Sequence, residues 1–126
     1  MTFKVLIVDD SVAVQRTLRD LVDSVDGFEV VGYAASEAEA TELLHFHEGR
    51  IDLVLLDLLI KDGSGFNLIS RASGEPKARV VVVSGYVTPG VATRCVALGA
   101  DAAYTKSDAP SLIAYLEGFS PPRRPG

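Results

Sequence analysis

Apolar residues along this chain fall into two kinds of run that alternate. One kind is short, continuous and rich in β-branched residues, as in VLIV, LVLL and VVVV. Strands of this composition are typical of a parallel sheet whose two faces are both covered. We therefore expect five buried strands, at Phe3–Val8, Phe28–Ala34, Asp52–Leu56, Arg79–Val83 and Ala102–Thr105.

The other kind of run is longer and has helical spacing. In the segment after the first strand, apolar residues recur at the helical period, and we expect the polar residues between them to face water. These outward residues are Gln15, Arg16, Arg19 and Asp20. The five expected helices are Val12–Ser24, Glu37–His47, Gly65–Ala72, Pro89–Leu98 and Ala109–Gly118.

Regular alternation of strands and helices predicts a doubly wound α/β domain. With a parallel five-stranded sheet in the order 2-1-3-4-5, this (βα)5 fold would be flavodoxin-like. The chain has 126 residues, of which 48% are hydrophobic, enough for one domain with its own core. We expect the domain to cover residues 1–119, followed at 120–126 by a flexible tail of prolines and arginines.

Charge and hydropathy exclude several kinds of partner. The formal net charge is −5, so we expect no direct contact with nucleic acid, which requires a basic surface. No apolar run approaches the roughly 18 residues of a membrane span. The apolar N-terminal run leads into acidic residues, so it is not a signal peptide. Cys95 is the one cysteine of the sequence and has no partner for an internal disulfide, which fits a cytoplasmic protein.

Polar residues stand where four of the five expected strands end. Asp9 and Asp10 end the first strand, Asp57 the third, Ser84 the fourth and Lys106 the fifth. In a doubly wound sheet, ligands bind beyond the carboxyl ends of the strands, where the winding reverses. With the expected strand order, that point lies between the first and third strands, so the carboxylates would meet there.

Three neighbouring carboxylates repel one another unless a cation lies among them. Magnesium is the natural ion, because Mg²⁺ prefers carboxylates, water and phosphate oxygens as ligands. Asp57 could then attack phosphorus as a nucleophile and form an acyl phosphate. Mg²⁺ and Lys106 would neutralise the transferring group, and Ser84 would donate a hydrogen bond to it. Each residue alone also suits a helix cap, a turn or a solvated surface, so only the combination is specific.

These motifs resemble the receiver domain of two-component response regulators, in particular the single-domain, chemotaxis-regulator-like form. The resemblance covers residues 3–118. Four segments carry the resemblance. VLIVDDS matches the strand with the acidic pair, and LVLLDLLIKDGSGFNLI matches the strand and loop with the phosphoacceptor. VVVVSGY matches the strand with the switch hydroxyl, and GADAAYTKS matches the strand with the active-site lysine.

The resemblance implies a role for each site residue. Asp57 would be phosphorylated, and Ser84 and Lys106 would bind the phosphoryl group. The expected Mg²⁺ ligands are Asp10 and Asp57 directly, Asp9 through a metal-bound water, and the backbone carbonyl of Leu59.

The resemblance also implies partners. A histidine kinase or phosphotransfer protein would donate the phosphoryl group, and the domain would catalyse only its own phosphorylation and dephosphorylation, not turnover of an outside substrate. A downstream protein would bind the face formed by Pro89–Leu98, Ala102–Thr105 and Ala109–Gly118. The domain would be a monomer or a phosphorylation-dependent dimer.

Three positions depart from the family pattern. Lys61 stands where proline is usual, which predicts a more mobile loop and adds a positive charge. Ala103 stands where the family has its aromatic switch residue, and Tyr104, one position later, would point to the opposite face of the sheet. Ser107 replaces a usual proline, and either Ser107 or Asp108 would cap the last helix.

Two other functions remain open from the sequence. A pseudo-receiver would keep the fold as a binding module without phosphorylation. The five intact site residues count against it, and the departures at Lys61 and Ala103 keep it open. A phosphohydrolase with a nucleophilic aspartate is a weaker hypothesis, because Leu59 stands where enzymes of the haloacid dehalogenase type have a second acid. The sequence leaves open the cognate kinase, the target and any output domain that follows residue 126.

Overall fold

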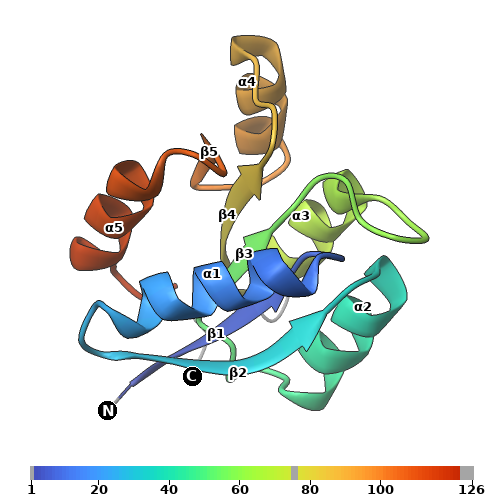
Figure 1. The fold of residues 1–126 in the computed structure, drawn as a ribbon. Helices are drawn as coiled ribbons and strands as arrows, with labels where there is room; N and C mark the ends of the chain where they lie inside the picture. The colour runs from blue at the N-terminus through green and yellow to red at the C-terminus, as the bar shows by residue number, and fades with distance from the viewer. Residues whose placement is uncertain (1, 75–76, 123–126) are drawn as a thin grey trace.

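The computed structural model describes residues 2–74 and 77–122. Strands and helices alternate along this part of the chain, as the ribbon shows (Figure 1). The elements are β1 (Phe3–Val8), α1 (Val12–Asp23), β2 (Phe28–Ala34), α2 (Glu37–Phe46), β3 (Leu53–Leu56), α3 (Gly65–Ser73), β4 (Arg79–Ser84), α4 (Pro89–Ala97), β5 (Ala102–Thr105) and α5 (Ala109–Glu117).

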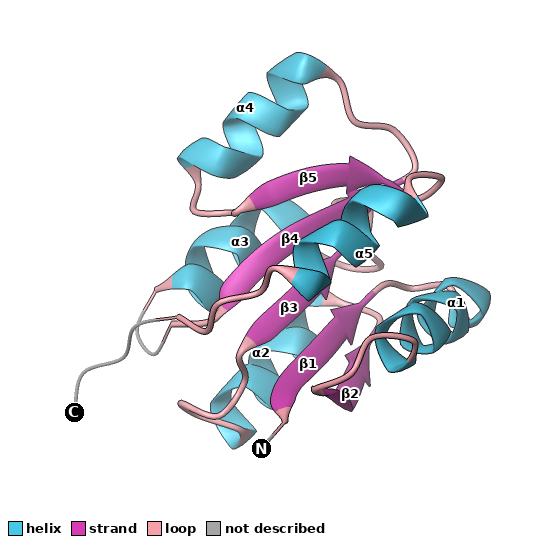
Figure 2. Cartoon of the chain, turned by 90° about the vertical axis from the view of Figure 1, so that its left-hand side faces the viewer, coloured by secondary structure: helices cyan, strands magenta, loops and turns pink. Residues whose placement is uncertain are grey.

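All five strands belong to one parallel sheet in the order β2-β1-β3-β4-β5. The arrows therefore point the same way, so that the carboxyl ends of the strands lie at one edge (Figure 2). The predicted flavodoxin-like fold and strand order are confirmed. Each predicted element differs from the observed one by at most one residue at either end.

Two layers of helices cover the sheet, and alternate residues of the central strands face each layer. One face of the sheet packs against α1 and α5, the other against α2, α3 and α4. Neighbouring residues such as Leu55 and Leu56 therefore belong to different apolar clusters, and both are fully buried. Burial on both sides is the reason that the strand sequences are continuously apolar.

Capping residues set where the helices begin. Ser11, Ser36, Ser64 and Thr88 each accept a hydrogen bond from the amide three residues ahead. At α5 the cap is Asp108, whose carboxylate accepts from the amide of Ser111. Of the two expected caps, Asp108 is therefore confirmed and Ser107 is not, since the Ser107 hydroxyl lies 3.1 Å from that of Thr105.

The chain remains packed against the domain just beyond the last helix. The ring of Phe119 lies 4.9 Å from that of Phe3 and 5.4 Å from that of Phe28, between centroids. The carbonyl of Ser120 accepts a hydrogen bond of 3.2 Å from Arg79 Nε. Most of the expected tail, 123–126, lies outside the described residues. Within residues 2–74 and 77–122, no helix is long and apolar enough to cross a bilayer.

Candidate functional site

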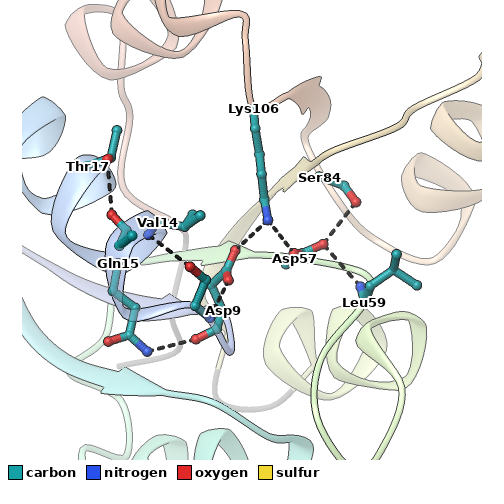
Figure 3. A network of polar contacts seen from close by, with 10 residues as sticks. Asp9, Val14, Gln15, Thr17, Asp57, Leu59, Ser84 and Lys106 are labelled. Atoms are coloured by element: carbon teal, nitrogen blue, oxygen red, sulfur yellow. Dashed lines mark hydrogen bonds and ion pairs between the residues drawn. The ribbon is translucent and has the colours of Figure 1, made fainter.

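Four of the predicted site residues meet at the carboxyl edge of the sheet. Lys106 Nζ lies between two carboxylates, 3.0 Å from Asp9 Oδ2 and 2.8 Å from Asp57 Oδ2 (Figure 3). The hydroxyl of Ser84 donates a 2.9 Å hydrogen bond to Asp57 Oδ1. Side chains from the ends of β1, β3, β4 and β5 thus form one hydrogen-bonded and charged cluster.

Backbone hydrogen bonds hold these residues just past the strand ends. The amide of Asp57 donates to the carbonyl of Val8, and that of Lys106 to Ser84, each at 2.9 Å. The amide of Asp9 donates in the same way to Ala34, also at 2.9 Å. Each ladder therefore continues one residue beyond the assigned strand, which fixes the position of the functional side chains.

The two central carboxylates are almost completely buried, with 1% of Asp9 and 4% of Asp57 exposed. Burial raises the pKa of Asp9 above its ordinary value, although the amide of Ser11 and the ammonium of Lys106 both oppose the shift. Burial by itself would lower the pKa of Lys106, but its contacts with Asp57 and Asp9 prevail and raise it. The lysine therefore stays charged between the two acids.

Asp10 and Leu59 are placed differently from these four residues. The side chain of Asp10 is exposed. Leu59 follows the phosphoacceptor strand, and its amide donates a 3.1 Å hydrogen bond to Asp57 Oδ1 while its side chain is 78% exposed. Within the described residues, no three His, Cys, Asp or Glu side chains are grouped so as to hold a metal by themselves.

The chemistry of the cluster nevertheless suits a hard cation. Asp9 Oδ2 is buried and accepts no hydrogen bond of good geometry, so that its only short polar contact is the ion pair with Lys106. A buried carboxylate oxygen with unused lone pairs is the kind of ligand that Mg²⁺ binds. Asp9 therefore fits the role of one ligand of a magnesium ion, with other oxygen ligands needed to complete the shell.

Two residues of the site were missed from the sequence. Gln15, which was expected to face water, is partly buried and donates from Nε2 to the carbonyl of Asp9 at 2.7 Å. Gly65 lies so close to the end of β3 that a Cβ there would come within 2.5 Å of Leu58 Cα and 2.6 Å of the Asp57 carbonyl. The sequence held one indication of this close contact: a glycine, which is a poor helix former, stands at the first position of the helix.

The departures from the family pattern also have structural counterparts. The amide of Lys61 donates to the carbonyl of Ala35 at 3.2 Å, a bond that proline could not make. This contact ties the loop after β3 to the loop after β2. Ala103 packs in the cluster under α2, α3 and α4, whereas Tyr104 packs in the cluster under α1 and α5. The opposite orientation predicted for these two neighbours is confirmed.

Comparison with known proteins gives the same assignment as the geometry. The family model of the response regulator receiver domain matches residues 5–117. Response regulator protein VraR of Staphylococcus aureus is 30% identical to this chain over 115 residues, which make up 90% of this chain and 54% of that protein. The chain thus spans about half the length of the curated relatives that it matches.

Solved structures of similar proteins have the same fold. The CheX–CheY–BeF3–Mg²⁺ complex from Borrelia burgdorferi contains a chain with a TM-score of 0.84 and 29% identity, covering 92% of this chain and 87% of that one. A response regulator protein from Burkholderia pseudomallei with a phosphorylated aspartic acid, calcium ion and citrate has a TM-score of 0.77 and 28% identity. That match covers 90% of this chain and 66% of the other.

The family match spans the whole cluster, from the acidic pair after β1 to the lysine after β5. The predicted resemblance is therefore confirmed over most of the chain. The chain belongs to the response regulator receiver domain family, the phosphoacceptor signalling module of two-component systems.

Proposed function

We propose that Asp57 accepts a phosphoryl group and that the group is bound by Lys106 and Ser84. The observation that carries this proposal is the buried Asp57 carboxylate, which has an ammonium 2.8 Å from one oxygen and a hydroxyl 2.9 Å from the other. Both groups are positioned to contact a phosphoryl group added to that carboxylate.

The transfer is a displacement at phosphorus. An oxygen of Asp57 forms the new O–P bond while the bond between phosphorus and the donor's imidazole nitrogen breaks, and its electron pair returns to the imidazole. Lys106 offsets the negative charge that then gathers between the two buried acids. Ser84 has to leave Asp57 Oδ1 in order to donate to a phosphoryl oxygen, so phosphorylation changes the loop after β4.

Magnesium would be held by Asp9, Asp10 and Asp57, together with the carbonyl of Leu59 and water. Support comes from the buried Asp9 Oδ2, whose one polar contact among the described residues is the ion pair with Lys106. Asp10 would turn inward from its exposed position to reach the ion. When bound, Mg²⁺ would neutralise charge on the transferring phosphoryl group.

The partners follow from this chemistry. A histidine kinase or a phosphotransfer protein of the cytoplasm would supply the phosphoryl group. The phosphorylated form would bind a downstream protein, or a second copy of the chain, through α4, β5 and α5. The functional unit would cover residues 1–119, because Phe119 still packs against Phe3 and Phe28, with 120–126 as a tail.

The decisive experiment compares Asp57→Asn with Asp62→Asn. Asp62 lies in the same loop region but is exposed, so it serves as a matched control. With Mg²⁺ and a small acyl phosphate, we expect mass spectrometry to show one added phosphoryl group on the wild type and on Asp62→Asn, and none on Asp57→Asn.

Two results would contradict the proposal. Normal phosphorylation of Asp57→Asn would place the acceptor elsewhere. Absence of phosphorylation in the wild type, together with no spectral response to Mg²⁺, would identify the chain as a pseudo-receiver that acts only by binding.

A further inference from the structure

The side chain of Gln15 holds the backbone of the acidic pair. Its Nε2 lies 2.7 Å from the carbonyl oxygen of Asp9, the shortest polar contact of α1 with the site (Figure 3). A carbonyl oxygen can only accept a hydrogen bond, so the amide nitrogen of Gln15 has to face it. This contact plays no part in the proposed transfer itself.

Within residues 2–74 and 77–122, no backbone amide donates to the carbonyl of Asp9. The ladder between β1 and β2 ends at the pair Val8 and Ala34. The chain after β2 then turns into α2, with Ser36 as its cap. The carbonyl of Asp9 lies just past this last pair, and a buried carbonyl without a hydrogen bond is costly.

The position of Gln15 on α1 explains how it reaches that carbonyl. The helix is capped by Ser11, and the amide of Gln15 donates to the Ser11 carbonyl at 2.9 Å, which places Gln15 one turn into the helix. Helical side chains lean toward the N-terminus of their helix. The Gln15 side chain therefore extends back along the first turn toward the end of β1.

Every polar group of Asp9 is held by a different part of the fold. Its amide donates to β2 at Ala34, Oδ1 accepts from the Ser11 amide at 2.9 Å, and Oδ2 pairs with Lys106. The carbonyl contact with Gln15 is the fourth. That carbonyl belongs to the peptide group between Asp9 and Asp10, so its orientation sets the direction in which both carboxylates leave the backbone.

We propose that Gln15 is a positioning residue of the phosphoacceptor site. By fixing the peptide between Asp9 and Asp10, it keeps the carboxylate of Asp9 directed toward Lys106 and holds the backbone from which Asp10 would reach the cation. This inference rests on the proposed function only for the role of the cation, since the hydrogen bond to Asp9 can be tested without it.

The test uses Gln15→Met, with Thr17→Met as the matched control. Methionine has similar length and helix propensity but no donor. Thr17 lies on the same helix and is exposed, and among the described residues its hydroxyl bonds only to the carbonyl of Ala13. In metal-free protein, we expect the carbonyl carbon resonance of Asp9 to shift in Gln15→Met and to stay unchanged in Thr17→Met.

The second measurement is Mg²⁺ affinity, from titration followed by amide chemical shifts. We expect Gln15→Met to weaken it by about fivefold, the effect of losing one neutral hydrogen bond. Thr17→Met should bind Mg²⁺ and melt as the wild type does. Gln15→Met should remain folded but melt at a lower temperature, because the buried Asp9 carbonyl loses its donor. Gln15→Lys, which keeps a long donor, should restore the Asp9 resonance.

Several outcomes would overturn the inference. One is an Asp9 resonance that does not change in Gln15→Met, and another is an Mg²⁺ affinity that falls equally in both methionine variants. An Asp9 resonance in Gln15→Lys that differs from that of the wild type would also overturn it. This comparison with the wild type still decides the question if Gln15→Met does not fold. A wild type that does not bind Mg²⁺ would refute the proposed function, while the metal-free resonance would still decide whether Gln15 holds Asp9.

Discussion

At the scale of single residues, Lys106 balances two acids that would otherwise repel each other. Asp9 and Asp57 are both nearly inaccessible to water, and burial, with a smaller contribution from the charge of Asp57, raises the pKa of Asp9. The lysine ammonium contacts one oxygen of each. Removing one partner of a buried charge pair is more costly than losing an exposed one, because the other charge is left uncompensated.

Lys106→Met is expected to slow phosphorylation of Asp57 by about a hundredfold, the effect of losing one preorganised group that stabilises the transition state. The initial rate with a small acyl phosphate and Mg²⁺ measures this loss. Lys61→Met is the control, because Lys61 is an exposed lysine in the loop after β3. Equal rates for the two variants would show that Lys106 does not act on the transferring group.

At the scale of elements, the loop after β3 is held by contacts that replace the usual proline. The amide of Lys61 bonds to Ala35, and the amide of Ser64 donates to Glu37 Oε1 at 2.9 Å. These bonds join this loop to the loop after β2 and to the first residue of α2. Gly65 then brings the first turn of α3 against the end of β3, directly beside the backbone of Asp57.

Gly65→Ala is expected to lower the free energy of unfolding by about 1–3 kcal/mol, the usual result of forcing extra atoms into a packed site. The atoms met by the new Cβ belong to the backbone at Asp57 and Leu58, so they cannot rotate away. Urea denaturation measures the change, and slower phosphorylation should accompany it.

Gly90→Ala is the matched control for this prediction. Gly90 also lies in the first turn of a helix, α4, but a Cβ there meets nothing nearer than Thr88 Oγ1 at 4.0 Å. Alanine is a better helix former than glycine, so this variant should be slightly more stable than the wild type. If both variants changed stability alike, the close approach at Gly65 would have no energetic effect.

At the scale of the whole molecule, the sheet was predictable and the details at its edge were not. Continuous apolar runs identify strands covered on both faces, and together with helical spacing they gave the element bounds and the doubly wound class. Residue type and position at the strand ends were enough to predict that Asp57, Ser84 and Lys106 lie close together. The outward direction of Asp10 and the inward direction of Gln15 depend on how the loop after β1 turns, which periodicity does not encode.

The opposite end of the sheet from the phosphoacceptor has a polar contact of its own, and it affects stability at high pH. The hydroxyl of Tyr115 on α5 donates a 2.6 Å hydrogen bond to Asp101 Oδ2. Arg79 Nη1 lies 3.5 Å from Asp101 Oδ1. Burial, followed by the contact with Asp101, raises the pKa of Tyr115 well above its ordinary value. An unfolded tyrosine titrates near pH 10.

Above about pH 10 the unfolded chain therefore loses the Tyr115 proton while the folded chain keeps it, so unfolding becomes easier as pH rises. Below that pH the contribution of the hydroxyl is complete.

We expect Tyr115→Phe to be about 1 kcal/mol less stable than the wild type at pH 8, and the difference to shrink by pH 11. Urea denaturation at both values measures it. Tyr86→Phe, at an exposed ring, is the control and should follow the wild type, because it leaves Tyr115 intact. A difference between wild type and Tyr115→Phe that is constant across this range would mean that the hydroxyl keeps its ordinary pKa in the fold.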